Sequence, residues 1–167
     1  MPNEAATPIL WAAPLQTQAD NLSIDLVAQR VEQKPDGSEF LHSSEKAKPG
    51  DIIEYAATYK NQSKGSISNL QPVLPIPLGT EYISASARPA PVAASLDGKK
   101  FSTIPLIRKV KQPDGKLQEQ EVPIAEYRAL KWSVKELSAG KTTTVSARVH
   151  VTNSPQVATT SGSPNGK

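Results

Sequence analysis

The sequence predicts an all-β fold, with about seven to nine short strands arranged as a two-sheet sandwich or a barrel. Three observations support this prediction. Several segments place apolar residues at every second position, which is the period of a strand with one buried face. Fifteen prolines and nine glycines provide turns between these segments and leave few windows for helices. The pattern lacks an alternation of strands and helices, and a proline-rich crossover favours a Greek-key sandwich.

The composition limits the classes of partner and cofactor. The chain has 167 residues, enough for one domain with its own core, and its formal net charge is +3. This positive charge is scattered, without the block of Lys and Arg that binds phosphates, so we expect no nucleic-acid partner. The chain has no cysteine, which excludes disulfides, thiolate metal sites and cysteine nucleophiles. No apolar run approaches the length of a membrane span, and we expect no membrane insertion of this segment and no cofactor.

The chain divides into three parts by composition. Residues 1–20 contain three prolines and no sustained period, which predicts an extended N-terminal arm with Ile9-Leu10-Trp11 as a candidate docking point. Residues 21–152 contain the alternating segments and are the predicted β-sandwich domain. Residues 153–167 have the composition of a flexible C-terminal tail.

The first predicted strand lies in residues 22–32, where apolar positions alternate with mostly polar ones. These apolar positions are Leu22, Ile24, Leu26 and Ala28. Some apolar residues of the segment also fall at helical spacing, so a helix stays open as the alternative. A Pro-Asp-Gly turn at residues 35–37 follows the segment.

The second predicted strand follows a Lys-Pro-Gly-Asp turn at residues 48–51. Its apolar face consists of Ile53, Tyr55, Ala57 and Tyr59. Asn61 is interpreted as a polar strand end that turns the chain. The aromatic residues of this strand, together with Trp132, are also candidates for a sugar-stacking platform. Their alternation with polar neighbours instead predicts that they are buried in the core.

Residues 72–78 contain three prolines. Proline has no N–H to donate to a sheet, so this segment is predicted to be an edge strand or an extended crossover. Leu74, Ile76 and Leu78 are either buried in the core or left open as a contact strip, and we expect burial, because contiguous exposed apolar patches are uncommon on monomers.

The remaining pattern predicts short strands separated by loops and tight turns. In a late strand Leu130, Trp132 and Val134 are expected to face inward. In order, the expected elements are a strand at residues 81–84, a loop at 85–94, a hairpin at 96–101, strands at 106–111 and 117–122 around a turn at 112–115, a strand at 130–134 and a last strand at 145–151.

Three stretches together resemble a known family. They are "KPGDIIEYAATYKNQS" (48–63), "LPIPLGTEYISAS" (74–86) and "YRALKWSVKELSAGKTTTVSARVHV" (127–151). Their order and spacing resemble the domain of unknown function 11 family, a conserved repeat domain of bacterial surface and exported proteins. The resemblance covers residues 47–151 and implies an immunoglobulin-like Greek-key β-sandwich. Family members commonly place an Asp where this chain has Val73-Leu74, so no role of that Asp is transferred.

Two patterns that are typical of ligand sites are better explained as turns. Gly140-Lys141-Thr142 is similar to the end of a phosphate-binding loop, but the earlier glycine and the following helix of that motif are missing. Asp36, Asp97 and Asp114 each precede a glycine and stand alone in turn signals. Calcium requires six or more oxygen ligands at one site, so we expect no metal site.

The two histidines, His42 and His150, are the candidates for general-base catalysis. His42 is predicted to lie in a loop beside Ser43, and His150 on the outward face of the last strand. No Gly-x-Ser-x-Gly motif supports a catalytic triad. We therefore expect surface histidines, no catalytic residue and no enzyme activity.

Together with these observations, the resemblance implies a non-catalytic structural or adhesive protein-interaction module that presents loops or a sheet edge to a protein partner. The loop at 85–94 supplies the candidate contact residues, which are Arg88, Pro89, Pro91 and Val92. The alternative is a carbohydrate- or ligand-binding module of the same fold, with a hydrolase third. The resemblance implies a bacterial protein exported to the periplasm, the cell surface or the medium. The sequence as given begins without a signal peptide, so export would require one removed before Met1.

Overall fold

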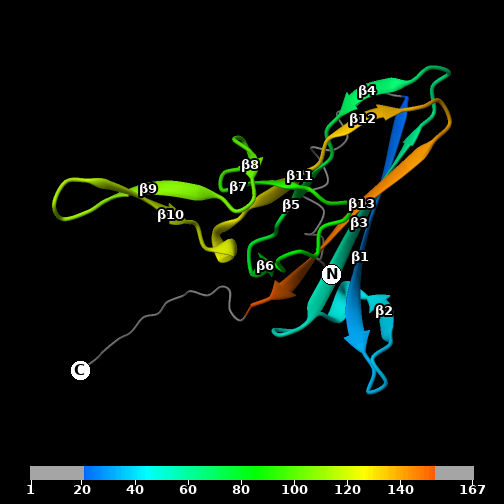
Figure 1. Cartoon of the computed structure of the whole chain (residues 1–167). Helices are drawn as coiled ribbons and strands as arrows, with labels where there is room; N and C mark the ends of the chain where they lie inside the picture. The colour runs from blue at the N-terminus through cyan, green and yellow to red at the C-terminus, as the bar shows by residue number, and fades with distance from the viewer. Residues whose placement is uncertain (1–20, 153–167) are drawn as a thin grey trace, which may run out of the picture.

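A computed structural model of the chain describes residues 21–152. This part of the chain consists of strands joined by turns, with two 3₁₀ helices and no α-helix (Figure 1). The all-β prediction is confirmed. The strands are β1 (Leu22–Gln33), β2 (Glu39–Ser43), β3 (Ile52–Asn61), β4 (Ile67–Leu70), β5 (Val73–Pro75), β6 (Thr80–Tyr82), β7 (Ala93–Ser95), β8 (Ser102–Thr103), β9 (Ile107–Lys111), β10 (Leu117–Glu121), β11 (Ala129–Lys131), β12 (Val134–Leu137) and β13 (Thr142–Val151). The 3₁₀ helices are η2 (Ser44–Lys46) and η3 (Ile124–Glu126).

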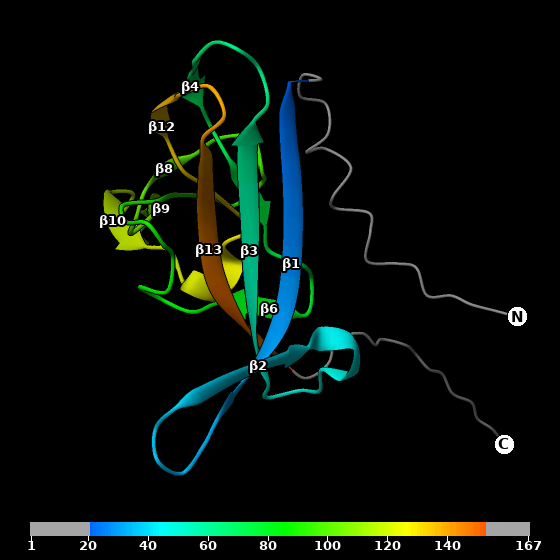
Figure 2. The same ribbon diagram turned by 90° about the vertical axis from the view of Figure 1, so that its right-hand side faces the viewer.

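The strands form two main sheets and two small ones, and all their pairings are antiparallel. A five-stranded sheet has the order β2-β1-β3-β13-β6, and a four-stranded sheet has the order β5-β11-β7-β8. The pairs β9–β10 and β4–β12 are separate two-stranded sheets. Figure 2 shows the long strands β1, β3 and β13 side by side, with β8, β9 and β10 away from them.

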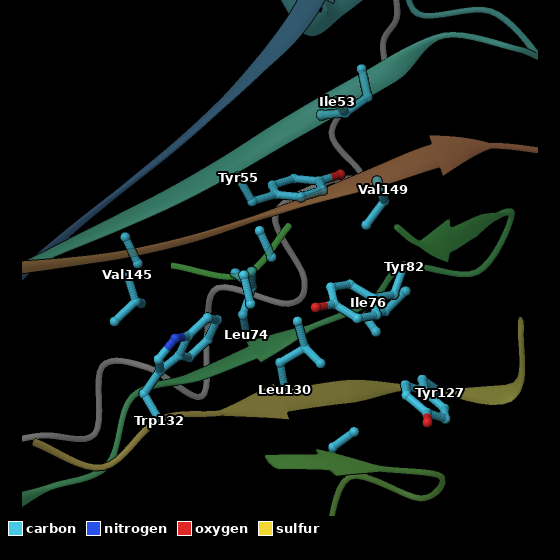
Figure 3. Packing of buried hydrophobic residues seen from close by; sticks show 14 of the residues in the cluster. Ile53, Tyr55, Leu74, Ile76, Tyr82, Tyr127, Leu130, Trp132, Val145 and Val149 are labelled. Atoms are coloured by element: carbon cyan, nitrogen blue, oxygen red, sulfur yellow. The ribbon is translucent and has the colours of Figure 1, made fainter. Parts of the chain in front are cut away.

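Side chains from the two main sheets meet in one hydrophobic core, which is the arrangement of a β-sandwich (Figure 3). In β3 the predicted apolar face is buried, with exposed fractions of 7% or less. Tyr55 of β3 lies opposite two small residues, Ala28 of β1 and Ala147 of β13, whereas Ala57 of β3 lies opposite Leu26 and Val145. This pairing of large with small side chains fills the layer without overcrowding it.

The segment that allowed either a strand or a helix is the strand β1. Leu22, Ile24, Leu26 and Ala28 face the core, but each is only partly buried. β3 flanks β1 along residues 22–31, whereas β2 pairs with it only from Gln29 to Gln33 on the other edge. The first half of β1 therefore has one edge without a partner strand among the described residues.

The proline-rich segment contains β5, which lies at the edge of the four-stranded sheet, as the missing N–H donors predict. Leu74 and Ile76 are buried, with 1% and 4% exposed. The expectation for Leu78 is wrong, since 85% of it is exposed. Leu78 follows β5 in a turn, where the Thr80 N–H donates to the Pro77 carbonyl at 3.1 Å, so the inward alternation ends before it.

The predicted strand at 130–134 is divided between two sheets. β11 pairs with β5 and β7, and the chain then passes to β12, which pairs with β4. Leu130 and Trp132 are buried as expected, but Val134 is half-buried because it lies opposite Leu70 in the small sheet. Residues 21–152 contain thirteen strands, more than the seven to nine expected, because of this division and of strands such as β2 that were not predicted.

Two further expectations change in detail. His42 lies in β2, opposite Arg30 of β1, and not in a loop, because β2 extends the hairpin from the turn at 35–37. The loop before β7 ends at Val92, since Ala93 and Ala94 pair with β11. The predicted arm at 1–20 and the predicted tail at 153–167 lie outside the described residues.

Candidate functional site

The candidate contact loop lies between β6 and β7. Arg88, Pro89 and Pro91 are exposed, whereas Val92 is half-buried and packs against the core. The Arg88 N–H donates to the Ser146 carbonyl at 2.7 Å, and the Ser146 N–H donates to the Arg88 carbonyl at 2.8 Å. The loop is therefore attached to β13, and three of its four candidate contact residues face solvent.

A second attachment joins this loop to the core. The Trp132 indole Nε1–H donates to the Pro89 carbonyl oxygen at 2.9 Å. The Arg88 guanidinium donates to the carbonyl oxygens of Ala85 and Ala87 at 2.8 and 2.9 Å. The loop thus presents a cation and two prolines on a fixed backbone. A fixed surface loses little conformational entropy when a partner binds.

A second candidate contact region is the β9–β10 hairpin, which projects away from the two main sheets (Figure 1). No third strand pairs with either strand among residues 21–152, so both outer edges of the hairpin are free. Every residue of the two strands is exposed except Val110, which is half-buried. Ile107 and Leu117 expose 52% and 64% of their surface, which is unusual for large apolar residues.

The two hairpin strands have opposite charges. β9 contains Arg108, Lys109 and Lys111, whereas β10 contains Glu119 and Glu121. Lys109 lies directly opposite Glu119 in the register. Oppositely charged cross-strand pairs stabilise a hairpin by a few tenths of a kcal/mol to about 1 kcal/mol, which supports its regular structure in solvent.

The base of the hairpin is anchored in the core. Leu106 and Val122 are 6% and 1% exposed, and the Val122 N–H donates to the Leu106 carbonyl at 2.8 Å. The Leu106 N–H donates to the Tyr127 hydroxyl at 3.1 Å. Arg108 forms an ion pair with Glu126 of η3 at 2.9 Å. The hairpin is therefore a fixed projection with free edges.

Arg148 joins three strands of the five-stranded sheet. Its Nε–H donates to Glu54 of β3 at 2.9 Å, and its two terminal nitrogens donate to Glu39 of β2 at 3.1 and 2.9 Å. These hydrogen bonds, together with the positive charge of Arg148, lower the pKa of Glu39. Both carboxylates are thus paired, and the cluster holds β2 against the sheet.

The candidate metal-binding and catalytic residues of the sequence analysis lie in turns or on the surface. No cluster of three or more His, Asp or Glu residues with metal-binding geometry exists in residues 21–152. Asp36 accepts from the backbone and hydroxyl of Ser38, and Asp114 accepts from the Lys116 N–H, as in turns. His42 and His150 are exposed, and His42 lies 3.5 Å from Glu32. Within these residues, no helix has the length and apolar content needed to cross a membrane.

The exposed hairpin was not identified from the sequence as a contact region, although a signal was present. Its two strands have polar residues on both faces, instead of the alternation seen in β3. A strand without an apolar face cannot cover a core, so this pattern indicates a projection from the domain.

Comparisons of the chain with protein-family models, with curated proteins and with solved structures found no match. A function therefore has to be inferred from the chain itself. The candidate contact surfaces described above are the β9–β10 hairpin and the loop at 85–92.

Proposed function

We propose that the chain is a non-catalytic structural or protein-interaction module of an exported bacterial protein, and that it presents the β9–β10 hairpin to a protein partner. The observation that supports this proposal most is a regular hairpin that is anchored by buried residues but has no sheet neighbour along either outer edge. Free strand edges bind a partner strand by β-augmentation, in which main-chain hydrogen bonds provide affinity. Ile107 and Leu117 would provide the apolar contacts.

The charges of the hairpin restrict what can bind. Charged side chains on an edge oppose indiscriminate strand pairing, which is the common hazard of a free edge. A partner strand beside β9 would meet Arg108, Lys109 and Lys111, whereas one beside β10 would meet Glu119 and Glu121. We therefore expect an acidic partner segment at β9 or a basic one at β10.

The carbohydrate-binding alternative has less support. Sugar-binding surfaces need exposed aromatic rings, but Tyr59 and Trp132 are each 2% exposed and Tyr55 is 7% exposed. Among the Phe, Tyr and Trp residues of 21–152, Phe40 has the most exposed ring, at 40%. The Lys34 ammonium lies over this ring, 3.6 Å from its centroid, and so covers one face on which a sugar would stack.

The immunoglobulin-like Greek-key topology, the membership in the domain of unknown function 11 family and the exported location are also part of this proposal. They rest on the order of three turn and packing motifs. Fractionation of cells that produce the protein naturally tests the location, since a cytoplasmic protein would contradict it.

The contact surface is tested by replacing the two exposed apolar residues of the hairpin with serine. Ile107→Ser with Leu117→Ser should leave the melting temperature almost unchanged, because both side chains are largely in solvent. Capture of a natural partner by the immobilised protein should fall strongly. Leu78→Ser is the matched control, since Leu78 is 85% exposed and belongs to the turn between β5 and β6, not to the hairpin. Equal capture by all three proteins would contradict the proposed role of the hairpin.

A further inference from the structure

Each strand of the β9–β10 hairpin turns the backbone groups of every second residue towards its free edge. The Val122 N–H donates to the Leu106 carbonyl, and the Gln112 N–H donates to the Lys116 carbonyl. In the register of the hairpin, even-numbered residues therefore bond across it, and odd-numbered residues turn their N–H and C=O groups outwards. The outward residues are Ile107, Lys109 and Lys111 in β9, and Leu117, Glu119 and Glu121 in β10.

A groove lies at the base of the hairpin. Its apolar walls are Leu106, Ile107 and Val122 from the hairpin base and Leu96 from the segment after β7. Asp97, Lys100 and Ser102 complete the lining. Of the outward residues of the two strands, only Ile107 lines this groove. The hairpin-base groove therefore continues the free edge of β9 and not that of β10.

The hairpin-base groove has the size for one apolar side chain. Its cavity volume is about 230 Å³, below the roughly 300 Å³ at which small-molecule pockets usually begin. An apolar cavity of about 150 Å³ already accepts benzene. Leu96 and Ile107 both line the groove, and they are 39% and 52% exposed. An inserted apolar side chain would remove part of both surfaces from water, which is favourable.

The edge of β9 has positive charge available to a partner. Ile107, Lys109 and Lys111 lie on one face of the hairpin, because alternate residues of a strand share a face. Lys111 lies opposite the apolar Leu117 and forms no ion pair within residues 21–152. Lys100 brings a further positive charge to the groove. This charge distribution favours an acidic partner segment at β9.

The acidic residue at the groove is bound in its own turn. Oδ1 of Asp97 accepts from the N–H groups of Lys99 and Lys100, at 2.8 and 3.0 Å. Arg108 of β9 is also engaged, since it donates to Glu126. The lysines of the edge are therefore the charges that a partner segment would meet.

We propose that the partner supplies an extended segment with the pattern acidic-x-acidic-x-apolar, which adds to the free edge of β9 as an antiparallel strand. This inference rests on the proposed function of the hairpin. The two acidic residues lie opposite Lys111 and Lys109, and the apolar residue lies opposite Ile107 and enters the hairpin-base groove. Directly opposite residues share one face of an antiparallel pair, so all three contacts form on the same face.

A second copy of the chain fits this edge less well. Two β9 strands paired about a two-fold axis at Lys109 would place like charges opposite each other, which is destabilising. β10 of another copy has acidic residues, but its antiparallel addition would hold both domains on the same side of one sheet. Hairpins two strands apart are separated by about 10 Å, less than the width of a domain whose radius of gyration is about 13 Å. A free segment of a different protein avoids this collision.

Amide chemical shifts of the ¹⁵N-labelled full chain, titrated with capped peptides, test the partner segment. The acidic probe is Thr-Glu-Thr-Glu-Thr-Leu, a lysine probe replaces both Glu residues, and a serine-ended probe replaces the Leu. Millimolar concentrations are needed, because pairing along one short edge is weak. The inference predicts that the acidic probe shifts the amides of Ile107, Lys109 and Lys111. The other two probes should bind there severalfold more weakly.

The outcomes separate this inference from the proposed function. No shift along β9 with the acidic probe, or equal binding of the lysine probe, overturns the inference. Shifts along β10 with the lysine probe overturn the choice of edge but leave the proposed function standing, since the hairpin still receives a strand. Failure of the proposed function itself appears elsewhere, as undiminished capture of a natural partner after Ile107→Ser with Leu117→Ser.

Two variants test the individual contacts. Lys111→Gln should weaken binding of the acidic probe severalfold, whereas the control Lys135→Gln, on exposed β12 surface, should not. Equal effects overturn the contact at Lys111. Leu96→Ser should weaken binding of the acidic probe but not of the serine-ended probe, because only the leucine enters the groove. Equal weakening of both probes overturns the insertion. Both substituted side chains are exposed, so the melting temperature should change little and confirms that the variants are folded.

Discussion

The Trp132 indole donates a hydrogen bond to the Pro89 carbonyl oxygen across 2.9 Å, and it thereby joins the centre of the core to an exposed loop. Trp132 is 2% exposed, whereas Pro89 is exposed. A polar atom at the edge of a large buried ring needs such a partner, and here the partner is loop backbone. The position of the loop therefore depends on the packing of the core.

Substitution of Trp132 tests this relationship. Trp132→Ala should lower the free energy of unfolding by about 3 to 5 kcal/mol, since it leaves a large cavity and an unpaired carbonyl. Trp132→Phe keeps most of the ring but loses the donor, so it should cost less. Chemical denaturation measures both values. A loss below about 1 kcal/mol for the alanine variant would mean that the side chain is not part of the core.

The loop at 85–92 should tolerate changes to its outward residues. Replacing Arg88 with Ser leaves the backbone bonds of the loop to Ser146 and Trp132 available and removes no buried side chain. The melting temperature should change little, while binding of a partner that uses this loop should weaken. Val92→Ser is the contrasting variant and should lower the melting temperature, because Val92 packs against the core. Equal thermal effects of the two replacements would show that the loop is not anchored as described.

Asn61 is a buried polar residue that should be essential for stability. Its Nδ2 group donates to the carbonyls of Gly65 and Leu137 at 2.7 and 2.8 Å, and its Oδ1 accepts from the Ser63 N–H and hydroxyl. Asn61→Ala leaves these groups unpaired and should cost about 2 to 3 kcal/mol. The exposed neighbour Gln62→Ala is the control and should stay within about 0.5 kcal/mol of the wild type in urea denaturation. Similar values for both variants would contradict the anchoring role of Asn61.

Asp97 should make stability depend on pH in the acid range. Hydrogen bonds from the N–H groups of Lys100 and Lys99, and from the Ser95 hydroxyl, lower the pKa of Asp97 to about 2. The unfolded chain has a pKa near 3.9 at this position. The stabilisation is therefore complete above about pH 4 and is lost as the pH falls towards 2.

Thermal unfolding of Asp97→Asn between pH 6 and pH 2 measures this contribution. The variant keeps an acceptor but cannot titrate, while the other carboxyl groups titrate equally in both proteins. The wild type should lead in melting temperature at pH 6, and this lead should shrink below about pH 4. A difference that stays constant over the whole range would rule out the lowered pKa.

The local parts of the fold were predictable from the sequence, because they depend on neighbouring residues. The buried face of β3 followed from its alternation, and the turn at 112–115 followed from Pro, Asp and Gly. Val134 could not be placed in this way, since its half-buried position depends on pairing with Leu70, 64 positions earlier. The transfer of the chain from one sheet to another leaves no local pattern.

The candidate contact surfaces were predictable only in part. The outward positions of Arg88, Pro89 and Pro91 follow from a Pro-rich loop, but the bond from Trp132 that fixes the loop is a contact between distant segments. The groove at the base of the hairpin was also hidden, because it forms between Leu96 and Val122, which are distant in the sequence.

Site-specific photo-crosslinking in cells that produce the protein naturally tests the proposed contact surface most directly. A photoreactive amino acid is placed at Leu117 on the hairpin and, as the control, at Leu78, which is even more exposed. The account predicts one recurrent protein adduct from position 117, which disappears when Ile107 is changed to serine, and no such adduct from position 78. The same adducts from both positions, or none from position 117 while position 78 reacts, would contradict the account.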